Sequence, residues 1–380
     1  MLRPALALLI VPSFLYSQDT TNTTHPRRRT EASHWHVGLT YHDYGITIGN
    51  AARTNGLRIN FEDADLDVVN GVNLTIWKAR EPLTGTVNGL ALGIVGPGAE
   101  ELNGVAIGIG GVVTERRARW LTIGGLGAVS NGGLEGIALS GFGTVANGDI
   151  AGVAIAGLGT VSNRNVTGVA IAGLGTVANN DVTGFAVAGL GTVANGDFGG
   201  IALAGLGTVV GRNLTGLGVA GLGTVANGDL GGVALAGLGT VVNRNLTGLG
   251  VGGLATVANG DTRGVAIGGL ATVVGGSLAG VGVSGLATVA NDELRGLGVA
   301  GYTVQAASIC GWSTALYVKT RGLHGVSIGA YNRVRGPQVG LTIGLYNSAR
   351  TLKGLQLGVL NRAQNNHGLA RILPIANAHF

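Results

Sequence analysis

The chain of 380 residues contains few cysteines, prolines, aromatic residues and charged residues. Its single cysteine, Cys310, excludes an intramolecular disulfide bond. With only seven prolines, and glycine not at every third position, the chain cannot form a collagen triple helix. Charged residues make up 11% of the chain and hydrophobic residues 46%, whereas disordered chains are highly charged and poor in hydrophobic residues. The composition therefore predicts a folded protein that is stabilised by burial and backbone hydrogen bonds alone.

Basic residues are scarce in the body of the chain, although the net charge is +5. Arg3 and the run at 27–29 supply four positive charges, and residues 136–295 contain five arginines against seven acids. Binding to nucleic acid needs a cluster of Lys and Arg on one face. We therefore expect neither a basic face nor a nucleic-acid partner.

The N-terminus has the layout of an export signal. One positive residue, Arg3, precedes an apolar stretch at 5–16, and the small Ser17 follows. This arrangement predicts a signal peptide at 1–17. The polar residues after it predict a disordered linker at 18–34.

A periodic array follows the linker. We expect an N-terminal β capping segment at 35–88, a β repeat array at 89–367 that is clearest at 104–311, and a C-terminal cap at 368–380. From Gly104 onward the chain repeats with a sixteen-residue period. This period is too short for helical-hairpin repeats and indicates stacked β units.

Two glycines recur in each repeat unit. The first stands at position 0, where Trp120 and Trp312 have the same phase, and the second stands five residues later. The position-0 glycines are Gly136, Gly152, Gly168, Gly184, Gly200, Gly216, Gly232, Gly248, Gly264, Gly280 and Gly296.

Aliphatic residues occupy positions 1, 3, 6 and 9, as Val153, Ile155, Leu158 and Val161 do. Positions 3 and 6 have opposite parity, so one straight strand would place their side chains on opposite faces. A bend at the second glycine, Gly157, removes this conflict and lets both sets of aliphatic residues converge on one interior. The sequence therefore predicts an all-β fold, a repeat β-solenoid with coils of about 16 residues.

Polar residues form a turn between units. The segments Asn-Gly-Asp at 147–149 and Asn-Arg-Asn at 163–165 contain residues that favour chain reversal. Acidic turns such as that of Asp197 alternate with basic turns such as that of Arg212. This alternation is favourable in a parallel stack with a spacing of about 4.8 Å, because like charges in adjacent coils would repel.

The alternation of acidic and basic turns gives the sequence a second period of 32 residues. This period also fits an antiparallel β-meander that closes into an outer-membrane β-barrel. Strands of about ten residues suit a bilayer. However, the repeats lack aromatic girdles, and apolar or small residues at both parities would line a wide lumen in water. The barrel is the alternative to the solenoid. The uncharged run 264–291 is interpreted as two repeat units rather than a membrane helix, because it contains eight glycines and keeps the repeat phase.

Two motifs are typical of binding sites but have simpler explanations. The pattern GxGxxG begins at Gly216, Gly248 and Gly296, in phase with the repeat and with no helix expected after it, so no nucleotide site is predicted. Cys310 lies in the slot that holds Leu294 one unit earlier, which predicts a small buried apolar residue rather than a nucleophile.

Metal ligands are also weakly indicated. His34, His36 and His42 lie near Asp43, but their spacing fits no metal motif. Alternating acids at 63–67 suggest Ca²⁺ ligation, although a solvated strand face explains them more simply. We therefore predict no catalytic, cofactor-binding or metal-binding residues and no enzymatic activity.

The ends of the array contain distinctive segments. They are GLTIGLYNSAR at 340–350, GLQLGVLNRAQNN at 354–366, LPIANAHF at 373–380 and NGLRINFEDADLDVVNGVNLTIW at 55–77. These segments resemble a family of bacterial surface-repeat proteins with units of the form G-(V/L)-x-(I/L)-G-L-x-N, over roughly 55–380. The resemblance implies an exported surface or outer-envelope protein of unassigned biochemical role. The central units differ by placing Gly-Thr where the family often has Asn, and Phe380 is similar to the last residue of outer-membrane barrels.

The expected function follows from these features. The sequence predicts a non-enzymatic exported repeat protein of the bacterial cell surface or outer membrane, acting as a structural or adhesive scaffold. The alternative is an outer-membrane β-barrel with an anchoring or transport role. Expected partners are cell-envelope or surface components, which flat Ala, Gly and Thr faces would contact, with membrane association through the outer membrane and no cofactor.

Overall fold

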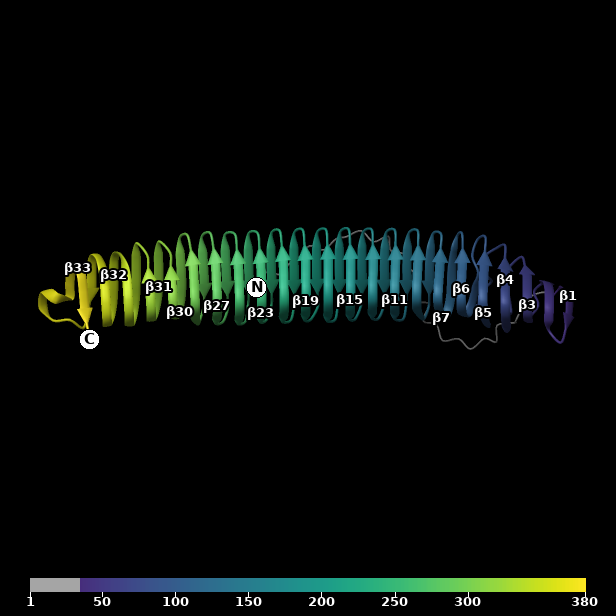
Figure 1. The fold of residues 1–380 in the computed structure, drawn as a ribbon, viewed down its shortest axis with the longest axis horizontal. Coiled ribbons are helices and arrows are strands. Elements are labelled where there is room, and N and C mark those ends of the chain that lie inside the picture. The colour runs from purple at the N-terminus through teal and green to yellow at the C-terminus, as the bar shows by residue number, and fades with distance from the viewer. Residues whose placement is uncertain (1–34) are drawn as a thin grey trace, which may run out of the picture. The chain divides into compact units, whose positions relative to one another are not determined.

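The computed structural model describes residues 35–380, which form one continuous stack of parallel β coils (Figure 1). The predicted signal peptide at 1–17, the linker at 18–34 and His34 lie outside the described residues. Successive coils pair in parallel, so the predicted β-solenoid with its sixteen-residue spacing is confirmed and the antiparallel meander is not formed.

Each coil of the central array contains one long and one short strand. A strand pairs with its equivalent in the next unit, as Gly152 does with Gly168 and Gly159 with Gly175. The long strands are β9(Gly133–Ser140), β11(Ile150–Ala156), β13(Val166–Ala172), β15(Val182–Ala188), β17(Phe198–Ala204), β19(Leu214–Ala220), β21(Leu230–Ala236), β23(Leu246–Gly252), β25(Thr262–Gly268), β27(Leu278–Ser284) and β29(Glu293–Ala300). The short strands are β8(Gly127–Ser130), β10(Gly143–Ala146), β12(Gly159–Ser162), β14(Gly175–Ala178), β16(Gly191–Ala194), β18(Gly207–Val210), β20(Gly223–Ala226), β22(Gly239–Val242), β24(Ala255–Ala258), β26(Ala271–Val274) and β28(Ala287–Ala290).

The uncharged run 264–291 extends from within β25 to one residue after the end of β28, as two repeat units would. In the part of the chain that the structure describes, no helix has the length and hydrophobicity needed to cross a bilayer.

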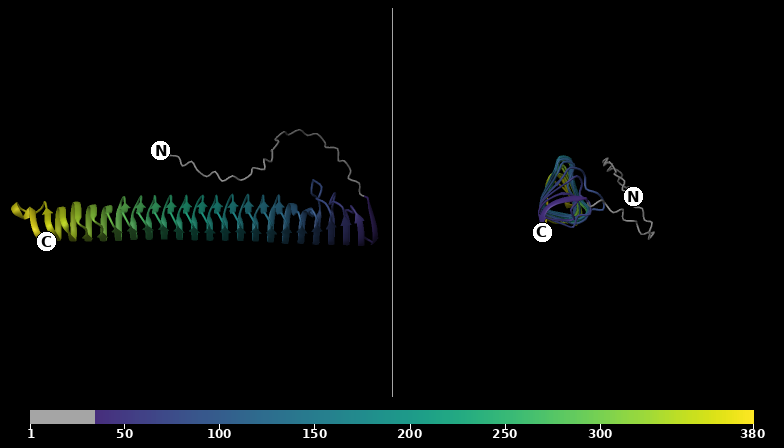
Figure 2. Two further views of the ribbon diagram at one scale, coloured as in Figure 1. Left: turned by 90° about the horizontal axis from the view of Figure 1, so that it is seen from above. Right: turned by 90° about the vertical axis from the view of Figure 1, so that its right-hand side faces the viewer.

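Each coil has three walls, and two of its three corners are at glycines (Figure 2). Gly152 bends the long strand with a φ of 120°, a region that side chains with a Cβ rarely adopt. Gly157 forms the second corner, between the long and the short strand. A Cβ at Gly157 would overlap the carbonyl oxygen of Gly141, and one at Gly152 would overlap that of Gly136. Both recurrent glycines are therefore required where adjacent coils approach most closely. The polar turn at 163–165 is the third corner.

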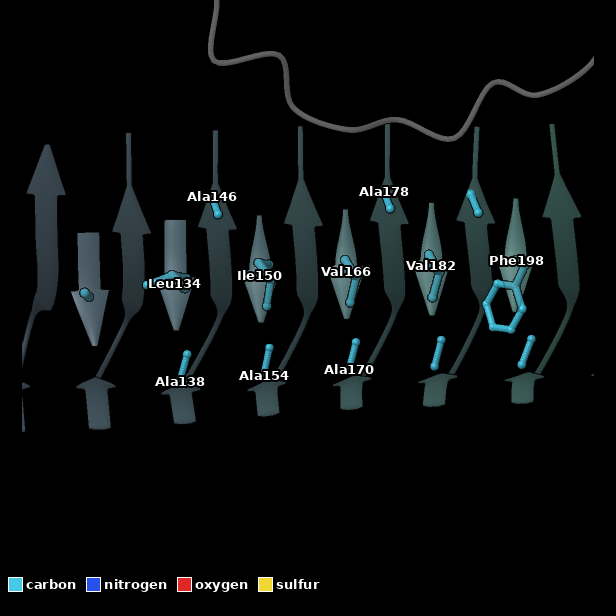
Figure 3. Close-up of a cluster of buried hydrophobic side chains, with 14 of the residues drawn as sticks. Leu134, Ala138, Ala146, Ile150, Ala154, Val166, Ala170, Ala178, Val182 and Phe198 are labelled. Carbon is cyan, nitrogen blue, oxygen red and sulfur yellow. The ribbon is translucent and has the colours of Figure 1, made fainter. Parts of the chain in front are cut away.

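The interior is filled by small residues. In the coil of β11 and β12 the buried side chains are those of Ile150, Ala154, Ala156, Thr160 and Ser162. Figure 3 shows Ile150, Ala154 and Ala146 pointing inward from three separate walls. One larger residue per coil, two residues before the first glycine, therefore packs against alanine and threonine.

The prediction of which residues fill the interior was wrong. Val153, Ile155, Leu158 and Val161 all point outward, and Ile155 and Leu158 are 39% and 47% exposed. The glycine bend does bring positions 3 and 6 to the same side of the coil, but that side is the outer one. Short walls enclose too narrow a space for four branched side chains, so the small residues between them face inward.

The N-terminal coils are less regular. Their strands are β1(His36–Tyr41), β2(Tyr44–Gly49), β3(Arg53–Asn60), β4(Val68–Thr75), β5(Thr86–Gly93), β6(Gly98–Gly108) and β7(Gly111–Gly124). β1 pairs antiparallel with β2, whereas β2 and every later strand up to β32 pair in parallel. Trp120 pairs with Gly104 and Gly136 at position 0, as predicted, and has a φ of 80°.

The C-terminal coils are shorter. Their elements are β30(Thr303–Thr314), β31(Tyr317–Ile328), β32(Tyr331–Ala363), the 3-10 helix η1(Gly368–Arg371) and β33(Ile372–His379), which pairs antiparallel with β32. The glycines equivalent to position 0 are Gly311, Gly325, Gly340 and Gly354, which follow one another more closely than those of the central units. Trp312 consequently pairs with Leu297 at position 1, and its predicted phase was wrong.

Candidate interaction surface

Aliphatic side chains form a continuous outer ridge at the corner after the second glycine. Backbone hydrogen bonds join ridge residues of adjacent coils, as the N–H of Leu174 donates to the carbonyl oxygen of Leu158 at 2.7 Å. The outer ridge consists of Leu126, Phe142, Leu158, Leu174, Leu190, Leu206, Leu222, Leu238, Leu254, Leu270, Leu286 and Tyr302.

The ridge is flanked on both walls by the outward residues at positions 1, 3 and 9. The outer faces therefore present Val, Ile and Leu, and the predicted Ala and Thr faces are instead largely inside. Contiguous apolar patches larger than a few hundred Å² are rare on soluble monomers and mark interaction sites, so a row of exposed aliphatic residues along the whole array is a candidate interaction surface.

Ladders of side-chain amide and carboxylate groups connect the polar turns on the outer surface of the central array. The Nδ2 of Asn163 donates to the Oδ1 of Asn147 at 2.7 Å, and the Nδ2 of Asn179 donates to Asn163 at 2.9 Å. A second ladder lies two positions later in each unit. In it, the Oδ1 of Asp197 accepts hydrogen bonds from both the backbone N–H and the Nδ2 of Asn213. These ladders join each turn to the next, so the turns are fixed parts of the stack.

The predicted alternation of acid and base in the turns is present. The Nη2 of Arg212 lies 2.7 Å from Asp181 and 3.4 Å from Asp197. The pKa of Asp181 is below its usual value, chiefly because its carboxylate accepts the N–H of Asp197, with a further contribution from Arg212.

The C-terminal coils carry a different outer wall. Thr303, Tyr317 and Tyr331 are paired in register, and Tyr331 stacks on Tyr346 with ring centroids 4.8 Å apart. Strand alternation places the residues two and four positions after each tyrosine on the same outer side, because the residues between them are buried. These outward positions hold Lys319, Arg321, Arg333, Arg335 and Arg350, and Arg362 follows on the last coil. We call the row of three tyrosines, Tyr317, Tyr331 and Tyr346, together with these six cations, the basic face.

The basic face contradicts the sequence-based expectation that no such face exists. Residues 296–380 contain eight Lys and Arg and not one Asp or Glu. The expectation failed because charge was counted over the central units, where acids and bases nearly cancel. Counting charge separately for each region of the chain would have found it.

A shallow apolar hollow lies on the other side of the tyrosines. It has a volume of about 660 Å³ and is lined by Leu316, Ile328, Leu345, Val359 and small residues between them. Leu316, Leu345 and Val359 continue the outer ridge and are 59%, 62% and 68% exposed. The C-terminal coils therefore present, in order, aliphatic, aromatic and cationic side chains.

The histidines proposed as weak metal candidates do not form a site in the described part of the chain. His36 begins β1 and His42 lies in the turn after it, edge-on to Tyr41. Within residues 35–380 no group of three or more His, Cys, Asp or Glu side chains is placed to hold a metal ion.

The acids at 63–67 do not form a solvated strand face. Asp63 is buried, and its Oδ1 lies 2.6 Å from Nη1 of the buried Arg58. Asn60 and Asn73 also donate to Asp63. Burial lowers the pKa of Arg58, while the adjacent Asp63 carboxylate opposes that shift. Every group in this network is paired, so it stabilises the loop and the first coils rather than offering a ligand site.

Cys310 is exposed, and its predicted burial was wrong. It pairs with Arg295, while Ile309 occupies the buried slot of Leu294, because the coil between Gly296 and Gly311 is shorter than a central coil. The GxGxxG segments lie in strands and coil corners with no helix after them; Gly216 and Gly218, for example, are in β19.

Comparisons with known proteins give no assignment. No family model matches the chain. No curated protein and no solved structure matches it either. The resemblance to bacterial surface-repeat proteins therefore stays a prediction, and the function has to be argued from the surface itself.

Proposed function

We propose that this chain is a non-enzymatic structural or adhesive scaffold, exported to the bacterial cell surface or outer membrane, that attaches to a lipid surface through its outer ridge. The observation that supports this proposal is the distribution of side chains in each central coil: alanine and threonine fill most of the interior, while the leucine, isoleucine and valine residues at positions 1, 3, 6 and 9 face outward along the stack.

This distribution of side chains is costly for an isolated monomer in water. Burying apolar area stabilises association by about 25 cal/mol per Å², so exposing a row of half-buried leucines favours contact with an apolar phase. The ridge is narrow, continuous and free of charge in the central array. It is therefore suited to insertion at the boundary between lipid headgroups and acyl chains, as the apolar face of an interfacial helix is.

A vesicle-binding experiment tests this proposal. The full chain is sedimented with phosphatidylcholine vesicles and compared with a variant carrying Leu206→Asn, Leu222→Asn and Leu238→Asn. If each half-exposed leucine contributes about 1 kcal/mol on insertion, the variant should partition roughly 100-fold more weakly.

The matched control places three asparagines on a different wall. Thr183, Thr215 and Thr247 are exposed on the long strands, and their replacement by Asn should leave vesicle binding unchanged. Equal binding of the ridge variant and the unmodified chain, or no sedimentation of the unmodified chain, would refute lipid attachment through the ridge.

A further inference from the structure

The cations of the basic face have no acidic partners. None of the ion pairs within residues 35–380 involves a residue after Arg295. Elsewhere in the stack an arginine usually meets a carboxylate on a neighbouring coil, as Arg116 meets Glu100 and Arg119 meets Glu135. The basic face therefore concentrates positive charge that nothing in the described chain neutralises.

The cations are arranged in rows along the stack. Lys319 pairs with Arg333 in the register of β31 and β32. Arg335 and Arg350 each stand three residues after an asparagine of one buried ladder, Asn332 and Asn347, so they occupy equivalent positions in adjacent coils. Adjacent coils are about 4.8 Å apart. Such rows fit several negative charges held side by side on one partner surface.

The tyrosines narrow the class of partner. Tyr317 and Tyr331 have ring centroids 5.2 Å apart, and Tyr331 stacks on Tyr346 at an interplanar angle of 21°. Tyr331 lies between the other two rings, so the rings contact one another instead of standing apart as separate platforms for successive nucleobases, as proteins that bind single-stranded nucleic acids provide. Their hydroxyl-bearing edges remain available at the surface.

The order of side chains across these coils matches the order of layers in a membrane interface. The exposed Leu316, Leu345 and Val359 come first, the tyrosines next and the cations last. Acyl chains, the interfacial region where tyrosine is enriched, and anionic headgroups follow one another in the same sequence. A soluble polyanion would use the cations but would have no use for the aliphatic row.

We propose that the basic face binds the anionic headgroups of a lipid surface and directs the C-terminal coils onto it. This inference rests on the proposed function and adds a lipid class and a location to it. The ridge supplies apolar contact along the stack, and the C-terminal coils supply the preference for negative charge.

The experiment compares two vesicle compositions with the full chain. Vesicles of phosphatidylcholine alone are set against mixed vesicles of phosphatidylcholine and phosphatidylglycerol. Several cations near an anionic surface should raise partitioning on the order of 100-fold at low salt. Raising the ionic strength should reduce binding to mixed vesicles toward the value for phosphatidylcholine, because screening weakens exposed charges.

Matched variants locate the effect. Arg333→Gln, Arg335→Gln and Arg350→Gln together should remove at least about tenfold of the preference for mixed vesicles. Arg164→Gln, Arg244→Gln and Arg263→Gln change the net charge equally but lie in the central array, and they should leave the preference nearly intact.

The outcomes separate this inference from the function on which it rests. Equal binding to both vesicle types would overturn the role of the basic face and leave attachment through the ridge standing. No binding to either type would overturn both. Binding of heparin or single-stranded DNA as tight as that of mixed vesicles, and unaffected by Leu316→Asn with Leu345→Asn, would show that the partner is a soluble polyanion instead.

Discussion

The central array at 136–295 and the C-terminal coils at 296–380 belong to one stack but differ in where side-chain hydrogen bonds join their coils. In the central array the amide ladder is outside, where asparagines such as Asn163 join the turns. In the C-terminal coils it is inside, where Asn332, Asn347 and Asn361 are fully buried and bonded in series at 2.8 Å. The buried asparagines occupy the coil position that threonine holds in the central array.

Because of this difference, the turns of the C-terminal coils do not need ladder asparagines. Position 11 of a central unit is held by ladder asparagines such as Asn147 and Asn179. The equivalent C-terminal positions hold Arg321, Arg335 and Arg350 and make no ladder. Because the side-chain hydrogen bonds between these coils are made inside, the outer turn can carry cations while the coils stay joined. One coil can therefore change its surface chemistry while its backbone path stays nearly constant.

The largest expected effect tests the close approach of coils in the central array. Gly200 has a φ of 130°, and a Cβ there would overlap the carbonyl oxygen of Gly184, whereas the adjacent Gly199 has no atom within 4 Å. Gly200→Ala should lower the unfolding free energy by roughly 3 kcal/mol or more, and Gly199→Ala should change it by less than about 0.5 kcal/mol. Thermal unfolding followed by circular dichroism measures both. A similar loss for the two variants would contradict the coil spacing.

The next effect compares one coil position in the two regions. Asn347 accepts from Asn332 and donates to Asn361 and to the carbonyl oxygen of Leu357. The hydroxyl of the buried Thr192 has no hydrogen-bond partner. Asn347→Leu should cost about 2–3 kcal/mol because it leaves polar atoms of its neighbours unpaired.

Thr192→Val is the matched change in the central array. It removes a buried hydroxyl without breaking a bond, so it should be neutral or stabilising by about 1 kcal/mol. Denaturant midpoints of the two variants give the comparison. A stabilised Asn347→Leu chain would show that the inner ladder does not hold the C-terminal coils together.

A smaller, stabilising effect is expected where the N-terminal coils depart from the glycine pattern. Trp120 occupies a position-0 site with a φ of 80°, and its side chain is 75% exposed. Trp120→Gly removes this backbone strain and should raise stability by about 1 kcal/mol. Differential scanning calorimetry should detect a higher melting temperature. If the melting temperature falls, the exposed indole makes a contact that outweighs the strain.

The smallest expected effect is a difference between the two regions in how their stability depends on pH. The pKa of Asp181 is lowered in the folded chain, so its stabilising contribution is complete above the unfolded pKa and is lost as pH falls through the folded one. Asp181→Asn keeps an acceptor for the N–H of Asp197, so it should reduce the loss of stability below about pH 4. Melting curves of both chains between pH 7 and 3 test this. Residues 296–380 contain no acid, so no matching dependence should arise there.

Most of the fold could be predicted from the repeat period of the sequence. The regular recurrence of two glycines predicted the coil length, and the parity argument at Gly157 predicted a bend with aliphatic residues on one side of it. Which side was interior did not follow from parity, because inward and outward sets alternate equally well. The decisive signal was volume. Ala154 and Ala156 are small in nearly every unit, as a narrow three-walled interior requires, while Ile155 is not.

The surface was harder to predict for a different reason. The outer ridge was visible as leucines but was assigned to the core, since apolar residues are usually buried. The basic face was missed because charge was counted over the central units at 136–295 and not over 296–380. Pairing across coils, such as Lys319 with Arg333, depends on the shortened C-terminal coils, and a repeat frame of fixed length misplaces these residues, as it misplaced Cys310.

The reversed strands at the two ends of the stack affect assembly. A bare parallel coil is a template on which a second copy can continue the hydrogen-bonding ladder, which is how fibrils elongate. β1 and β33 run opposite to the strands they cover. Each end of the stack therefore presents a single reversed strand to its surroundings rather than a coil that runs in the direction of the array. A second copy that stacked on either end would meet a strand of the opposite direction and could not continue the parallel register directly.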